Sequence, residues 1–103
     1  MGESPPIKTV RIRAYGRVQG VWYRAWTVER AAALGLDGWV RNRSDGSVEA
    51  LFAGPAGNVE RMVEACREGP PHALVERIEV TAAGEGDAEA VAPGGGFRQR
   101  PTR

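Results

Sequence analysis

The chain has 103 residues, of which 42% are apolar and 26% charged, and its formal net charge is +1. A chain of this size builds one globular core, so two full domains are excluded. Because 14 basic and 13 acidic side chains nearly cancel, the overall charge gives no reason to expect a nucleic-acid or membrane partner.

The number of cysteines and the hydropathy pattern narrow the class of protein further. Cys66 is the single cysteine, which excludes an intrachain disulfide and any centre built on two thiolates. No apolar run has the length of a signal peptide or a membrane span, so we expect a cytoplasmic protein. Residues 1–6 hold two adjacent prolines without a hydrophobic period, and they predict a flexible leader before one domain over residues 7–103.

The first predicted elements are a strand, a loop and a helix. Apolar and polar side chains alternate from Ile7 to Tyr15, which is typical of a strand with one buried face. Gly16 and Gly20 then break the alternation and predict a tight loop. A helix is predicted from Val21 to Leu34, with Gly35 ending it. Its predicted inner face consists of Val21, Tyr23, Thr27, Val28, Ala31, Ala32 and Leu34.

A hairpin and a second helix follow. Leu36 to Arg43 and Val48 to Phe52 alternate on either side of Asp45-Gly46, a pair typical of tight hairpin turns, so two antiparallel strands are predicted. Apolar residues then recur with the spacing of one helix face until Gly69 ends the segment. This predicted helix face consists of Val59, Met62, Val63 and Cys66.

The last part of the chain predicts one regular strand and one short one. Leu74 to Val80 changes its alternation near Glu76, which indicates a β-bulge. Residues 83–96 are rich in glycine and have little to bury, so they predict a mobile loop before a short strand over Phe97 to Arg100. The order β-α-β-β-α-β predicts a ferredoxin-like α+β sandwich, an antiparallel sheet with two helices on one face.

The loop after the first strand has the features of an anion site. It leads directly into a helix N-terminus, where unpaired amides and the helix dipole both favour negative charge. The glycine spacing fits neither a Walker loop nor a dinucleotide fingerprint, so a small phosphate is the better ligand. The predicted phosphate-binding segment consists of Gly16, Arg17, Val18, Gln19, Gly20, Val21 and Trp22.

Arg24 stands in the first turn of the predicted helix, where a cation is unfavourable unless an anion accompanies it. This placement favours a role in binding the ligand. The alternative is a surface arginine that lies over Trp22 or Tyr23 or pairs with a nearby acid, and the spacing leaves this alternative open.

Asn42 is the second polar candidate. It keeps the parity of Val40, so its side chain is predicted on the helix side of the sheet, where an amide can orient a water molecule. An asparagine before a hairpin more often serves the turn itself, and this alternative also stays open.

Two stretches resemble the signatures of a known family. Gly16-x-Val-Gln-Gly-Val-x-x-Arg24 and Gly38-Trp-Val-Arg-Asn42-x3-Gly46-x-Val48-x5-Gly54 are similar to the two acylphosphatase motifs, within a resemblance that runs from about Thr9 through Val80. The resemblance implies a ferredoxin-like fold. It also implies a loop that cradles phosphate, an arginine that binds it and an asparagine that positions the attacking water. These last two roles fall on Arg24 and Asn42.

The resemblance and the chemistry together predict a metal-independent enzyme without a cofactor. An acyl phosphate already carries a good leaving group, so its hydrolysis needs mainly positioning and charge stabilisation. We expect hydrolysis of small acyl phosphates to carboxylate and inorganic phosphate, inhibition by that phosphate, and a monomer. Two departures stand out: Tyr23 replaces the usual Phe, and Gln99 and Pro101 stand where apolar residues are expected.

A nucleic-acid-binding module of the same fold is the alternative function. Arg11, Arg13 and Tyr15 are predicted on the open face of the sheet, the face that RNA-recognition domains use. Glu49 and Leu51 on the same face argue against base stacking.

The other reactive or aromatic side chains have structural interpretations. Cys66 is predicted in the core and His72 in solvent. Helix packing and cover of the sheet explain most aromatic residues in a small domain, so base stacking is only a minority alternative for Trp22, Trp26 and Trp39.

Overall fold

The computed structural model describes residues 6–83, 91 and 94–103. Most of the predicted leader over residues 1–6 and most of the predicted mobile loop over residues 83–96 lie outside the described residues, namely residues 1–5, 84–90 and 92–93.

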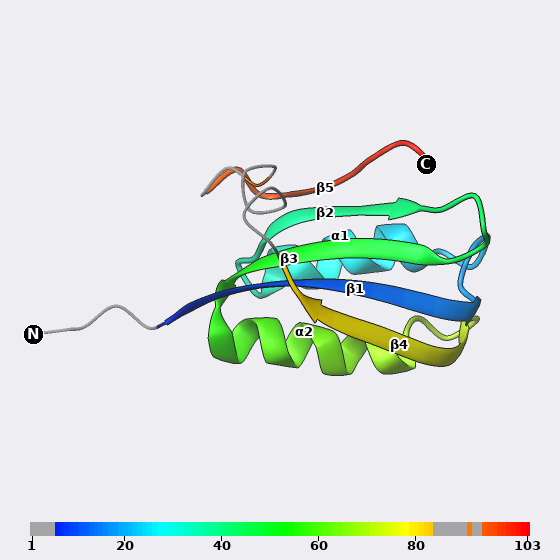
Figure 1. The fold of residues 1–103 in the computed structure, drawn as a ribbon, viewed down its shortest axis with the longest axis horizontal. Coiled ribbons are helices and arrows are strands. Elements are labelled where there is room, and N and C mark those ends of the chain that lie inside the picture. Colours follow the sequence, from blue (N-terminus) through cyan, green and yellow to red (C-terminus); the bar gives the residue numbers. More distant parts are fainter. Residues whose placement is uncertain (1–5, 84–90, 92–93) are drawn as a thin grey trace, which may run out of the picture.

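In the described residues, two helices and five strands form one sandwich, in the predicted order (Figure 1). Residues alternate between core and solvent along β1, whose inward side chains are buried against the helices. The elements are β1 (Ile7–Arg17), α1 (Tyr23–Ala33), β2 (Asp37–Asn42), β3 (Val48–Pro55), α2 (Ala56–Glu68), β4 (Leu74–Ala82) and β5 (Phe97–Gln99).

The sheet has the strand order β4-β1-β3-β2-β5. Neighbouring strands pair antiparallel as predicted, except that β5 pairs parallel with β2. β1 and β2 lie on either side of β3 and run in the same direction. The loop after β1 and the last residue of β2 are therefore at the same end of the sheet.

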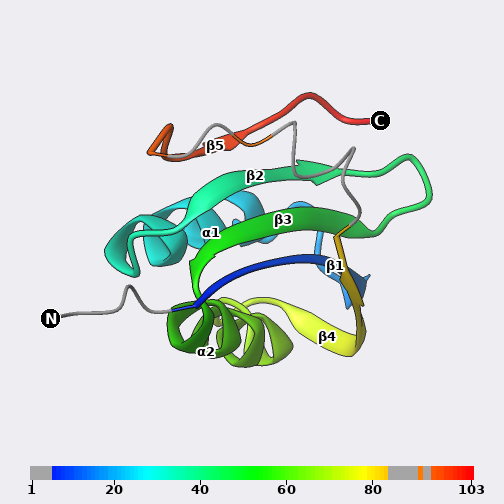
Figure 2. The same cartoon turned by 60° about the vertical axis from the view of Figure 1, so that its left-hand side comes forward.

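Both helices cover one face of the sheet, and the core lies between them and the strands (Figures 1 and 2). The core contains Cys66, as predicted, and His72 is exposed, as predicted. The largest fully buried apolar side chains are Tyr23, Phe52, Ile12, Leu36, Leu51 and Met62. Leu51 lies beside Trp39 on the face of the sheet that the helices do not cover.

Helix α1 departs from its predicted limits and face. It begins at Tyr23 because Trp22, its N-cap, has a left-handed backbone with φ 68°. Tyr23, Thr27 and Ala31 are its buried residues. The prediction that Ala32 faces the core is wrong, since Ala32 is exposed. A methyl group is tolerated equally well on either face, so alanine spacing defines a helix face poorly.

The predicted bulge in β4 is confirmed. Tyr15 pairs with Arg77 and Gly16 with Val75, which leaves Glu76 as the extra residue. The β4 backbone approaches Gly16 so closely that a Cβ there would lie 2.3 Å from the carbonyl oxygen of Leu74. Glycine is therefore required where β1 passes the bulge, just before the candidate site.

The described end of the glycine-rich segment is attached to the sheet. Asp37 Oδ2 and Oδ1 accept hydrogen bonds of 2.8 and 2.9 Å from the amides of Gly94 and Gly96. The Gly38 amide donates to the carbonyl oxygen of Gly96 at 3.1 Å. These contacts align β5 beside β2.

None of the helices in the described ranges is both long and apolar enough to cross a membrane.

Candidate active site

One cleft of about 360 Å³ brings Arg24 and Asn42 together. It opens where the loop after β1, the start of α1 and the end of β2 meet. Gly16, Arg17, Gln19 and Val21 do not line it. The lining residues are Val18, Gly20, Trp22, Tyr23, Arg24, Ala25, Asn42 and Gln99.

The N-terminus of α1 leaves its first amides without partners inside the helix. Trp22 accepts the first helical hydrogen bond, 2.9 Å from the amide of Trp26. No side chain of the described residues caps this end, and its first turn has no acidic residue. Three successive N–H groups, of Tyr23, Arg24 and Ala25, therefore lie at the positive end of the helix dipole beside the cleft.

The loop backbone is shaped by two left-handed residues, Gly20 with φ 73° and Trp22 with φ 68°. A Cβ at Gly20 would meet nothing within 4 Å, so backbone conformation rather than crowding favours glycine there. The side chain of Val18 is buried and anchors the loop in the core. The loop is thus held at one end and open toward the cleft at the other.

The guanidinium of Arg24 is uncommitted within the described part of the chain. It makes no hydrogen bond, ion pair or ring contact with any described residue, and its side chain is half-buried. Neither stacking on Trp22 or Tyr23 nor pairing with an acid is seen. The alternatives left open by the sequence therefore have no support among the described contacts.

Asn42 ends β2 opposite Val48, and its side chain lines the cleft. Its carbonyl oxygen accepts a hydrogen bond of 3.0 Å from the amide of Arg103. Its side-chain Oδ1 is buried and has no hydrogen-bond partner among the described residues. An unpaired buried acceptor costs about 1–3 kcal/mol, so this amide is positioned at the expense of stability.

The hairpin turn is closed without the side chain of Asn42. The Ser47 amide and hydroxyl donate to Asp45 Oδ1 at 2.9 and 2.6 Å, and the Arg43 amide donates to the carbonyl of Ser47 at 2.8 Å. The hydrogen bonds from the Ser47 hydroxyl and amide lower the pKa of the Asp45 carboxyl. Turn chemistry therefore belongs to Asp45 and Ser47, not to Asn42.

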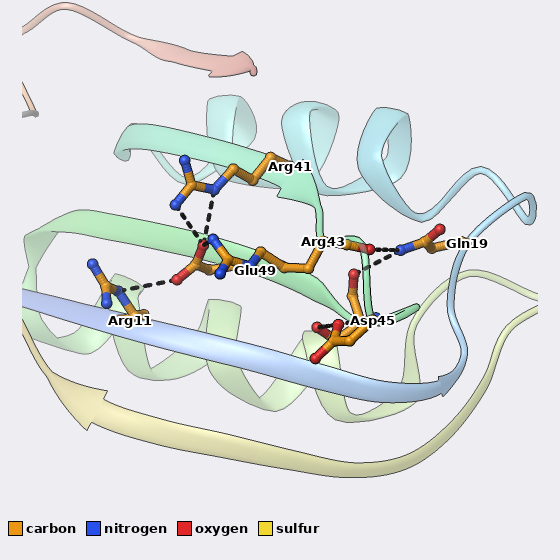
Figure 3. A network of polar contacts seen from close by, with 7 residues as sticks. Arg11, Gln19, Arg41, Arg43, Asp45 and Glu49 are labelled. Atoms are coloured by element: carbon orange, nitrogen blue, oxygen red, sulfur yellow. Dashed lines mark hydrogen bonds and ion pairs between the residues drawn. The ribbon is translucent and has the colours of Figure 1, made fainter. Parts of the chain in front are cut away.

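Gln19 joins the loop to this hairpin (Figure 3). Its Nε2 donates to the carbonyl oxygens of Arg43 and Ser47, both at 2.8 Å. The sequence placed Gln19 in the phosphate-binding segment, whereas its side chain holds the hairpin that carries Asn42. The sequence pattern does not predict this contact, because Gln19 precedes Arg43 by 24 positions and Ser47 by 28.

A charge network stiffens the same hairpin from the opposite face of the sheet (Figure 3). Buried Glu49 pairs with Arg41 at 2.8 Å, with Arg43 at 3.3 Å and with Arg11 at 3.4 Å. Arg41 also lies over the ring of Trp39, 4.6 Å from its centroid. Arg41 and Arg43, within the second motif, thus form ion pairs on the open face of the sheet. Asn42 is the polar residue of that motif that lines the cleft.

Gln99 is a cleft residue that sequence reasoning missed. It pairs with Val40, whose side chain faces the helices, so Gln99 lies on the helix side of the sheet. The signal in the sequence was that Gln99 is polar at a position where an apolar residue was expected. It marks the place where β5 borders the cleft rather than the core.

Tyr23 carries a hydroxyl where phenylalanine is usual, and this hydroxyl has a hydrogen-bond partner. It donates to the carbonyl oxygen of Cys66 at 2.7 Å and thereby links α1 to α2. Burial raises the pKa of Tyr23, and burial also raises the pKa of the Cys66 thiol to about 12. Both groups stay neutral and serve packing. In the described ranges no three His, Cys, Asp or Glu residues lie close enough to hold a metal ion.

This combination defines a class: a ferredoxin-like domain with an uncapped helix, a free arginine and a buried amide around one cleft. The sequence model of the acylphosphatase family matches residues 10–91. An acylphosphatase of Rhizorhabdus wittichii is 59% identical over 92 residues, covering 89% of this chain and 87% of that protein.

Solved structures agree with this match. The acylphosphatase of Bacillus subtilis has a TM-score of 0.78 at 36% identity, and the matched region covers 92% of this chain and 99% of that one. The acylphosphatase of Coxiella burnetii has a TM-score of 0.80 at 31% identity, with 91% and 93% covered. The chain belongs to the acylphosphatase family. Its activity is the hydrolysis of the carboxyl-phosphate bond of acyl phosphates, and the nucleic-acid-binding alternative is not favoured.

Proposed function

We propose that this cleft binds the phosphate of an acyl phosphate through Val18, Gly20 and Trp22 of the predicted segment and through Arg24, and that Asn42 positions the water that attacks phosphorus. The observation that carries the proposal is the meeting of a free guanidinium, uncapped helix amides and an unpaired buried amide oxygen in one cleft. Each of these groups lacks the partner that a phosphate or a water would supply.

Phosphate binding is supported by charge and shape. A dianion at the N-terminus of α1 meets main-chain N–H groups and the positive end of the helix dipole. Arg24 adds a planar pair of donors that matches two phosphate oxygens. The anion also removes the unfavourable interaction between Arg24 and the helix dipole, so substrate binding stabilises this end of α1.

Water positioning is assigned to the Asn42 side chain. Rotation about its Cβ–Cγ bond exchanges the amide oxygen and nitrogen, which brings the unpaired acceptor toward the cleft. There the amide oxygen accepts a hydrogen bond from water and thereby orients a lone pair of the water oxygen toward phosphorus. Gln19 keeps the hairpin, and therefore Asn42, at a fixed place relative to the loop.

The reaction then needs little else from the protein. The water oxygen bonds to phosphorus, the bond from phosphorus to the bridging oxygen breaks, and the carboxylate leaves with the electron pair. The water releases its proton to solvent, and inorganic phosphate remains in the cleft. Because the leaving group is stable as an anion, we propose that the enzyme works without metal or cofactor and that inorganic phosphate competes with substrate.

We also propose that the enzyme acts as a cytoplasmic monomer. Its single cysteine is free and buried, which suits a reducing compartment. The large apolar side chains exposed in the described ranges are Ile7 on β1, Trp22 before α1, and Leu74 and Val80 on β4. Sedimentation of the purified protein measures its oligomeric state.

Turnover with and without chelator tests this proposal. We expect hydrolysis of acetyl phosphate but not of a phosphate monoester such as p-nitrophenyl phosphate, because its p-nitrophenolate leaving group is more basic than a carboxylate and needs more assistance. The rate with acetyl phosphate is expected to be unchanged in EDTA. Loss of turnover in EDTA that a divalent cation restores would refute the metal-free mechanism.

A further inference from the structure

Trp22 combines two unfavourable features that the fold does not need. Its side chain is 77% exposed, although tryptophan is among the most apolar large residues. Its backbone has φ 68° and ψ 16°, and it is the one non-glycine residue with positive φ in the described ranges. A left-handed conformation strains a residue with a Cβ, and glycine would adopt it freely.

Packing does not account for the indole of Trp22. The other two tryptophans have partners: the ring of Trp26 lies 5.5 Å from that of Tyr23, and Arg41 and Arg100 both lie over the ring of Trp39. Trp22 makes no ring or cation contact with any described residue. Its ring therefore adds no described contact to the folded protein.

The position of Trp22 relates it to the substrate. It lines the cleft that contains Arg24 and Asn42. Among the large apolar side chains that the described structure exposes, it alone borders this cleft. With the phosphate held by the first turn of α1, the acyl group is one bridging oxygen away, which keeps it near the cleft that this ring lines.

We infer that the side chain of Trp22 is the acyl-group platform of the enzyme and selects acyl phosphates with an aromatic or extended apolar acyl group. This inference rests on the proposed phosphate site and adds the part of the substrate that the phosphate cradle does not recognise. An apolar ring packed on the indole loses water and gains stacking contacts, whereas an acetyl group covers little of it.

The test compares the ratio of kcat/KM for benzoyl phosphate to kcat/KM for acetyl phosphate in several variants. The ratio cancels any effect that a change in the loop backbone has on both substrates. In Trp22→Gly, which fits the left-handed backbone, we expect the ratio to fall about tenfold. Trp22→Phe keeps an aromatic face and is expected to retain most of the ratio. Leu74→Ala removes an apolar side chain that is 64% exposed and outside the cleft, so it is the matched control.

The outcomes separate this inference from the proposed phosphate site. A wild-type enzyme that inorganic phosphate inhibits, together with an unchanged ratio in Trp22→Gly, overturns the acyl platform alone. Absence of phosphate inhibition in the wild type overturns the phosphate site and the platform with it. A thermal melt of Trp22→Gly checks folding, and its Tm is expected to equal or exceed that of the wild type because the strain is relieved.

Discussion

Arg24 supports the proposed phosphate site because its guanidinium lacks a partner among the described residues. A cation in the first turn of α1 opposes the helix dipole, and no described residue compensates it. We predict that Arg24→Ala weakens inhibition by inorganic phosphate by about 1.5–3 kcal/mol, the range for a charge-assisted hydrogen bond, and lowers kcat/KM by more.

Arg24→Lys separates charge from geometry. An ammonium keeps the charge but lacks the planar pair of donors, so we expect it to restore only a small part of kcat/KM. Inhibition constants for phosphate and kinetics with acetyl phosphate on both variants provide the measurement. Near-wild-type values for Arg24→Ala would return this residue to an ordinary surface role.

Asn42 is expected to affect chemistry and leave binding intact. A neutral amide contributes little to holding a dianion, but it fixes the orientation of a water molecule. We predict that Asn42→Ala lowers kcat by at least about 100-fold, the scale of a misplaced reacting group, while the inhibition constant of phosphate stays close to wild type.

Stability distinguishes this role of Asn42 from a role in the turn. Because Oδ1 has no described partner, Asn42→Ala is not expected to destabilise the fold, and denaturant melts measure this. A turn residue would show the reverse pattern, a loss of about 1 kcal/mol in unfolding free energy with full activity per folded molecule.

The sequence predicted Arg24 and Asn42 as site residues, and both line one cleft, whereas contacts between distant segments were missed. Arg24 and Asn42 were recognisable because their chemistry and local position were visible in the chain. The side-chain contact from Gln19 to the hairpin, and the place of Gln99 at the cleft, depend on which segments become neighbours in the sheet. No local pattern encodes such contacts.

The contact between α1 and α2 makes a prediction about alkaline stability. Tyr23 and Cys66 are neutral in the folded protein because burial raises both pKa values, that of Cys66 to about 12. In the unfolded chain they lose protons near pH 10 and pH 8.5. Above about pH 8.5 the unfolded state therefore binds fewer protons than the folded state, and stability falls as pH rises.

The size of this effect is measurable by denaturant melts at pH 7, 9 and 10. Each titrating group lowers the unfolding free energy by up to about 1.4 kcal/mol per pH unit once its unfolded pKa is passed. Cys66→Ala removes one group and is expected to give a shallower decline between pH 9 and 10. An equally steep decline in that variant would assign the effect to other groups.

Regular elements were predictable where one period dominated their sequence. Alternation predicted β1 and the bulge in β4, and helical spacing predicted α2 with its buried face. The parallel pairing of β5 was not predictable, because a three-residue strand has too little pattern to define direction. Its place beside β2 depends on hydrogen bonds from Gly94 and Gly96 to Asp37, far away in sequence.

The whole molecule explains why a small domain can position this site. β1 and β2 run in the same direction on either side of β3, so the loop after one and the end of the other meet. The core below holds Val18 and Tyr23, and the Glu49 network stiffens the hairpin from the opposite face. The groups around the cleft are thus fixed before substrate binds, which is what catalysis by positioning requires.

We propose that the loop holds phosphate and that the attacking water is directed at phosphorus. A cluster of main-chain amides could instead hold the oxygen of an acyl carbonyl, in which case water would attack carbon. The most direct test is hydrolysis of acetyl phosphate in ¹⁸O-labelled water, with mass spectrometry of both products and subtraction of the uncatalysed reaction. We predict that the label enters inorganic phosphate. Label in acetate would contradict the account.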